Sequence, residues 1–423
     1  MSEIERSLHP EQFLNTLLII GNGFDLHLDI KTDYKTFFDD QMKNPGFSKT
    51  YDFFHNFYME INLNGKHLFR DSMKDYGDLF LSEITVWDLL FMGKSKDSKN
   101  KNWCDIEEEM ANSLVPISKI TPQKVPGPPT LWKKVKTLLQ QDEQYEDKMM
   151  QYQNPSLENF IAAVISYCYP KIGGGWKNDR IRKELVKTDV SWAEFLLNQL
   201  KLFEKKFGNF VIEQIKNRDL FNTMALGFAH HILEEDIALQ EYPDIGQEFN
   251  FNILSFNYTW NYDDVLTPGS RIVEMDNVHG IAKDGGIIFG IDNVLASSDD
   301  YWFPFTKTYR KLEKYTNSDD PNPHHVFDPK ITRILFYGHS LNRQDYSYFQ
   351  SIFDFYEIYS KPVTLVFFYS IYEGVPEEVI KKNVTDRVYA LLNNYGKTFD
   401  NQAKGKNLSH MLLLGPRVFI KKI

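Results

Sequence analysis

Short, continuous apolar segments that stop at Gly, Asn or Asp are the feature that most constrains the fold of this chain. Residues 16–21 (TLLIIG) form one such segment near the start, and five more follow after residue 250. These segments do not alternate between apolar and polar positions, which is typical of strands buried on both faces of a parallel sheet. The later segments are residues 251–257, 271–280, 286–292, 331–338 and 362–369.

The middle of the chain has a different pattern, with little strand signal between residues 50 and 245. Residues 191–215 begin with Ser191 and Glu194 at capping-box spacing and continue with apolar residues at helical spacing. Residues 154–169 and 218–239 have the same helical pattern, and prolines break the region at 116–130. We therefore predict an α/β protein with a Rossmann-like, mostly parallel sheet and a large, mainly helical insertion. The predicted core comprises residues 1–48 and 248–423, and the predicted insertion is 49–247.

Composition narrows the class of partners. A net charge of −10 makes the chain a poor general binder of nucleic acid. Two cysteines are too few for a disulfide framework or a four-cysteine zinc site, so no metal site is predicted. The apolar runs are too short to span a bilayer, and the first residues lack the order of a signal peptide. We expect a cytoplasmic protein that does not enter a membrane.

The first predicted strand ends in a turn that suits a nucleotide. Gly21, Asn22 and Gly23 follow the apolar run directly, and Phe24 and Asp25 come next. Glycines allow the backbone to approach a phosphate, and N–H groups at the start of a following helix favour negative charge. A tight strand-to-helix turn with no ligand explains the same residues equally well.

Polar residues also follow the next two predicted strands. Asn257 at a strand end can orient water or a ribose hydroxyl, although an Asx turn that caps the strand is the simpler explanation. His279, followed by Gly280, has the chemistry of a general base near neutral pH. Ligands of parallel sheets bind at the carboxyl ends of the strands, so both residues are candidates for a site.

Two later strand ends complete the pattern. Asp292 follows the segment 286–292, and Gly338, His339 and Ser340 form a turn after the segment 331–338. Asp345 then lies in the first turn of a predicted helix. This turn is built like the first one, and two such turns in one sheet suit a dinucleotide better than a mononucleotide.

In this order, the segments IIGNGFDL, LSFNYT, NVHG, IIFGID and LFYGHSL resemble the AbiH family of bacteriophage abortive infection proteins. That family is similar to the SIR2-like NAD-binding fold. The resemblance covers residues 14–40 and roughly 248–370. Between them, Trp103, Asp105 and Glu107 resemble a Trp-x-Asp-x-Glu element of the family, although an acidic first helical turn also explains them.

The resemblance implies NAD as a substrate and gives roles to individual residues. His279 and Asn257 match the catalytic histidine and asparagine of that fold, and we expect them to act as the base and as the group that positions water. Asp25 stands where SIR2-like proteins carry a small hydroxyl residue, and we expect it to lie near the ribose and stabilise the developing charge. The residues implied to bind the nucleotide are Gly21, Asn22, Gly23, Phe24, Thr32, Gly280, Asp292, Gly338, His339, Ser340 and Asp345.

We therefore expect an anti-phage abortive-infection effector that hydrolyses NAD at the nicotinamide–ribose bond, as an NAD nucleosidase. A phage-derived trigger and a homo-oligomer are the expected partners besides the nucleotide, and the helical insertion is the expected place for control. Two alternatives stay open. One is a sensor that binds NAD or ADP-ribose without turnover, and the other is a metal-dependent nuclease that uses Asp25, Asp292 and Asp345.

Overall fold

The structure is a computed structural model, and it describes twelve parts of the chain. These are residues 13–49, 51–52, 84–95, 105–115, 192–216, 220–238, 249–265, 270–292, 300, 302–316, 325–372 and 374–423. The predicted helix at 154–169, the proline-containing stretch at 116–130 and Trp103 lie outside them. The chain divides into a first compact unit (1–32, 208–288, 314–423) and a second (33–207, 289–313). The domain boundaries expected at 48/49 and 247/248 stay a prediction.

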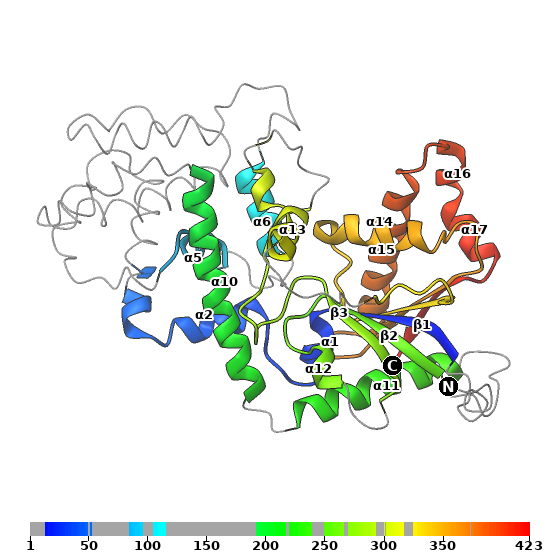
Figure 1. The fold of residues 1–423 in the computed structure, drawn as a ribbon, viewed down its shortest axis with the longest axis horizontal. Helices are drawn as coiled ribbons and strands as arrows, with labels where there is room; N and C mark the ends of the chain where they lie inside the picture. Colours follow the sequence, from blue (N-terminus) through cyan, green and yellow to red (C-terminus); the bar gives the residue numbers. More distant parts are fainter. Residues whose placement is uncertain are drawn as a thin grey trace, which may run out of the picture. The chain divides into compact units, whose positions relative to one another are not determined.

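The first unit contains a six-stranded sheet in which every pair of neighbours is parallel, and this confirms the predicted α/β class (Figure 1). The strands are β1 (Phe13–Ile20), β2 (Phe249–Ser255), β3 (Ile272–Asn277), β4 (Arg333–Tyr337), β5 (Thr364–Tyr369) and β6 (Val418–Lys422). Their order is β3-β2-β1-β4-β5-β6. The order reverses direction between β1 and β4, and ligands of doubly wound sheets bind beside such a switch point.

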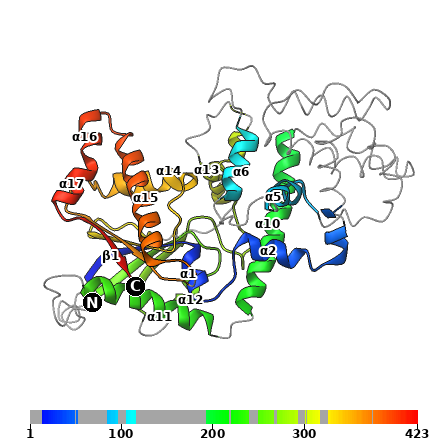
Figure 2. The same ribbon diagram turned by 180° about the vertical axis from the view of Figure 1, so that it is seen from behind.

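Helices cover both faces of this sheet, which explains why its strands are continuous apolar runs. Residues 17–20 of β1 are all fully buried. Leu17 and Ile19 belong to a core that includes α14 (Tyr346–Phe355) and α15 (Glu377–Gly396). Leu18 and Ile20 point the other way, into a core that includes α11 (Phe221–Ala238). Figures 1 and 2 show α11 on one side of the sheet and α14 and α15 on the other.

Short elements complete the first unit around these layers. They are α1 (Asn22–His27), α12 (Tyr262–Val265), the 3-10 helix η7 (Arg343–Asp345), α16 (Gln402–Lys406) and α17 (Leu408–Leu414). The sequence did not predict β6. Its residues are only half buried at the sheet edge, so the segment lacks the apolar run that marks the inner strands.

The strand expected at 286–292 is absent, so this prediction was wrong. Among these residues the structure has only an isolated bridge between Ile291 and Thr306. Two N–H groups of this run bind side-chain carboxylates: Phe289 donates to Glu204 Oε1 at 2.8 Å, and Gly290 to Glu107 Oε1 at 3.4 Å. Other N–H groups bind loop carbonyls, such as Ile288 N to His279 O at 2.9 Å. An apolar run between glycines resembles a strand in sequence even when side chains and loop carbonyls satisfy its backbone.

The described part of the second unit is helical. It contains α2 (Tyr34–Gln41), α5 (Val86–Ser95), α6 (Asp105–Leu114), most of α10 (Trp192–Lys216), the 3-10 helix η6 (Phe303–Phe305) and most of α13 (Lys307–Thr316). The helices predicted at 191–215 and 218–239 are confirmed as α10 and α11. Aromatic rings fill the unit's core: Phe207 packs against Tyr34 and Phe289 with ring centroids 5.0 and 5.5 Å apart.

Two buried ion pairs stabilise the same unit. Lys307 is 1% exposed, and its Nζ lies 2.7 Å from Glu107 Oε2. One helical turn later, Arg310 binds both oxygens of Glu204, with Nη2 to Oε2 at 2.8 Å. Each glutamate therefore binds a cation of α13 and a backbone N–H of residues 289–290. Glu107, whose role the sequence left open, is a structural anchor here.

We expect Glu107→Ala to destabilise the second unit by about 3–5 kcal/mol, because the buried Lys307 ammonium loses its carboxylate. The double variant Glu107→Leu with Lys307→Met removes both charges and is expected to recover most of that loss. Denaturant unfolding of the two variants and the parent checks this. Equal loss in the single and double variants would contradict it.

Candidate active site at the carboxyl edge of the sheet

Two glycine turns meet backbone to backbone at the switch point. One follows β1 and the other follows β4, and the two strands are neighbours. Gly21 N donates to Tyr337 O at 3.0 Å, and Gly23 N donates to Gly338 O at 2.8 Å. A Cβ atom at Gly23 would lie 2.6 Å from Gly338 Cα, so no larger residue fits this approach. These N–H groups are used within the fold, and phosphate binding by the turns stays a prediction.

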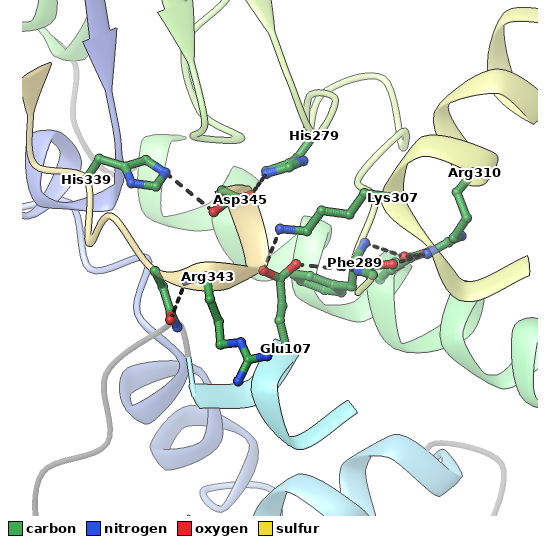
Figure 3. Close-up of polar contacts among 11 residues, drawn as sticks. Glu107, His279, Phe289, Lys307, Arg310, His339, Arg343 and Asp345 are labelled. Carbon is green, nitrogen blue, oxygen red and sulfur yellow. Dashed lines mark hydrogen bonds and ion pairs between the residues drawn. The ribbon is translucent and has the colours of Figure 1, made fainter. Parts of the chain in front are cut away.

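A carboxylate shared by two histidines lies beside these turns (Figure 3). His279 Nε2 is 3.0 Å from Asp345 Oδ1, and His339 Nε2 is 3.5 Å from Asp345 Oδ2. His279 follows β3, His339 follows β4, and Asp345 ends η7 at the start of α14. All three side chains are at most 11% exposed. The structure thus brings together three residues that the sequence placed at separate strand and helix ends.

The hydrogen bonds define the state of one of these imidazoles. Leu341 N donates to His339 Nδ1 at 2.9 Å, so that nitrogen is an acceptor and the neutral ring carries its proton on Nε2, toward Asp345. Phe256 packs edge-on against both rings, with centroids 5.4 Å from His279 and 4.4 Å from His339. Apolar walls make a carboxylate more effective at stabilising a protonated imidazole.

A second polar cluster lies around Asp25, which is 1% exposed on α1. Thr259 Oγ1 donates to Asp25 Oδ1 at 2.9 Å, and Thr32 Oγ1 lies 3.3 Å from Asp25 Oδ2. Burial raises the pKa of Asp25 to about 7, against smaller opposing effects of the side chains of Thr259, Thr32 and Asn257. Asp25 is therefore poised to exchange a proton near neutral pH.

Asn257 is a buried polar residue that makes few hydrogen bonds with the described part of the chain. The residue is 3% exposed, and its side chain is one of the groups that lower the pKa of Asp25. Neither its amide nitrogen nor its oxygen makes a hydrogen bond of good geometry within the described part of the chain. Buried amides normally have partners, and exceptions mark a strained site, a water or a ligand.

The structure gives the other predicted site residues different surroundings, and not all of them lie in the first unit. Thr32 donates to Asn22 Oδ1 at 2.6 Å, which ties the first turn to the Asp25 cluster. The ring of Phe24 is fully buried against Trp260, with centroids 5.8 Å apart. Gly280 has φ +80, and a Cβ there would meet Gly286 O. Asp292 belongs to the second unit, and its binding role stays a prediction.

The sequence missed Thr259 as a member of the site. It lies two residues beyond Asn257 and binds a carboxylate 234 positions earlier in the chain. Only its place just after a strand end pointed to it. Among the described residues, no group of three His, Cys, Asp or Glu side chains is arranged to hold a metal ion.

Fold and site together define a doubly wound α/β protein with a polar, largely buried site at its switch point. Comparison with known proteins gives the family. The profile described as bacteriophage abortive infection AbiH matches residues 17–369, which is more than half of the chain. The chain belongs to the AbiH family, and the family implies a function in abortive infection of phage-infected bacteria.

No curated protein and no solved structure matches the chain. Among the described residues, no helix has both the length and the apolar character needed to cross a membrane.

We expect Gly338→Ala to destabilise the first unit by about 2 kcal/mol or more, because Gly338 combines a φ of +70 with a Cβ position 2.4 Å from Phe24 N. Gly374→Ala is the matched control, since Gly374 has φ +81 but nothing within 4 Å of its Cβ position. The difference between their melting temperatures measures the contact between the turns. Equal melting temperatures would show that the close approach does not constrain the fold.

Proposed function

We propose that this protein is an abortive-infection effector that hydrolyses NAD at the nicotinamide–ribose bond. The observation that carries the proposal is the buried His279–Asp345 pair at 3.0 Å, on the same sheet edge as the unsatisfied amide of Asn257. The AbiH membership and the doubly wound strand order support it, because dinucleotides bind at the switch point of such sheets.

Cleavage of this bond passes through an oxocarbenium-like state, so the protein must position the ribose and deliver water. In the proposed mechanism, His279 takes a proton from the attacking water or from a ribose hydroxyl. Asp345 binds His279 Nε2 and stabilises the imidazolium that forms. Asn257 holds the water with its amide. Water adds to the ribose carbon, the bond to nicotinamide breaks, and the products are nicotinamide and ADP-ribose.

Ser340 and the two glycine turns lie where the phosphates of the dinucleotide are proposed to bind. Loss of NAD would stop phage replication together with the metabolism of the infected cell. Such an effector has to stay inactive before infection, so a phage-derived trigger and assembly into a homo-oligomer are part of the proposal.

Purified protein incubated with NAD is expected to release nicotinamide and ADP-ribose. Both His279→Ala and Asp345→Asn are expected to slow release by about 100-fold or more, the usual contribution of a general base and its partner. His410→Ala and Asp386→Asn are matched controls, because both residues are exposed on α17 and α15. The readout is chromatography of the products, with the NAD content of infected cells as a second measurement.

The outcomes separate the proposed functions. No loss of NAD in the tube or in infected cells would reject hydrolysis. Tight binding of NAD or ADP-ribose without turnover would select the sensor. Cleavage of DNA or RNA by the protein with added divalent metal would select the nuclease.

A further inference from the structure

We propose that Asp25 is a positioning residue that carries a proton: as a neutral acid it leaves the Asn257 amide to the substrate, and as an anion it binds that amide itself. The inference rests on the proposed function and adds a regulation of the same site. It replaces the role of a charged carboxylate beside the ribose, which we expected for Asp25 from the sequence.

The hydroxyl protons around Asp25 favour its neutral form. The Thr32 hydroxyl has one proton and lies 2.6 Å from Asn22 Oδ1 but 3.3 Å from Asp25 Oδ2. The shorter contact takes the proton, so Thr32 has only a lone pair to offer Asp25 Oδ2. Two acceptor oxygens then face each other unless Asp25 itself supplies the hydrogen. Thr259 donates to the other oxygen, Oδ1, and is compatible with both protonation states.

The surroundings of Asp25 contain little that would favour the anion. Within the described residues no Lys, Arg or His forms an ion pair with it, and burial is the main influence on its pKa. On its own helix, His27 Nδ1 instead bonds to Tyr337 Oη at 3.1 Å. On α12, Asp263 is exposed and Asp264 is half-buried. A buried carboxylate with one strong donor is stabilised far less than one with two or three.

Ionisation would therefore recruit a further donor, and the amide of Asn257 is the candidate because its side chain favours the charged form of Asp25. That amide stabilises the charged form of Asp25 and makes no other hydrogen bond of good geometry among the described residues. When Asp25 is neutral, its proton satisfies Thr32 Oγ1 and the amide is not needed. The same amide thus serves either the carboxylate or the substrate, and the proton on Asp25 decides which.

This switch has a definite direction with pH. Burial raises the pKa of Asp25 from 3.8 to about 7, so the folded protein holds a proton that the unfolded chain releases. The stability from this proton is complete below pH 3.8 and is lost as the pH rises to about 7. NAD turnover is expected to decline as the pH rises through about 7, as the anion forms and binds Asn257.

The first test compares Asp25→Asn, which cannot ionise, with the parent protein and with Asp386→Asn, an exposed control. The melting temperature of Asp25→Asn is expected to rise relative to the parent between pH 4 and 8, while that of the control does not. The ratio of parent to Asp25→Asn turnover is expected to fall about 30-fold between pH 6 and pH 8.5, for a group with a pKa of about 7. A variant inactive at every pH would show that the carboxylate itself is required, and would overturn the proposal.

The second test needs no NAD turnover, so it survives failure of the proposed function. A double-mutant cycle of Asp25→Asn and Asn257→Ala, read by melting temperature, is expected to show coupling at pH 8.5 and little at pH 6. Coupling independent of pH would overturn the switch. If Asp25→Asn fails to fold, Thr259→Val removes the strongest donor to the anion and is expected to move the midpoint of the parent's pH profile upward. Thr259→Ser should restore the midpoint, and an unmoved midpoint would count against the proposal.

Discussion

The contact between two backbones at the switch point is the constraint on which the rest of the site depends. Gly23 approaches Gly338 so closely that a single Cβ atom at either position would overlap the other turn. This approach fixes the end of β1 against the end of β4 and hence the start of α1 against the start of η7. Asp25 lies on α1 and Asp345 lies on η7. The positions of both acids therefore depend on the backbone contact between Gly23 and Gly338, which involves no side chain.

Burying the acidic side chains at this edge of the sheet costs free energy, and the fold offsets that cost differently for each acid. Asp345 is paired with two imidazoles, whose Nε2 atoms lie 3.0 and 3.5 Å from its oxygens. Asp25 has hydroxyl groups and a shifted pKa instead, which is how a buried acid without a cation avoids its charge. The second unit uses a third solution, pairing Glu107 with Lys307.

Much of this fold can be predicted from sequence because the sheet is buried on both faces. Apolar runs without alternation predicted β1, β2, β3, β4 and β5, and helical spacing predicted α10 and α11. The half-exposed β6 has no such run, and residues 286–292 have one without being a strand. At the site, strand ends pointed to His279, Asn257 and Asp345 individually. Pairing between them was not predictable, because it depends on strand order and on side-chain contacts across more than sixty positions.

The residues that directly follow β2 contribute to both polar clusters, the one around Asp345 and the one around Asp25. Phe256 and Asn257 are consecutive residues just beyond the strand, so one short stretch of backbone holds both side chains. The Phe256 ring packs against both histidines, whereas the Asn257 side chain lowers the pKa of Asp25. One short stretch of backbone after β2 therefore supplies a side chain to each polar cluster, and no described hydrogen bond or ion pair joins Asp25 to the His279–Asp345 pair.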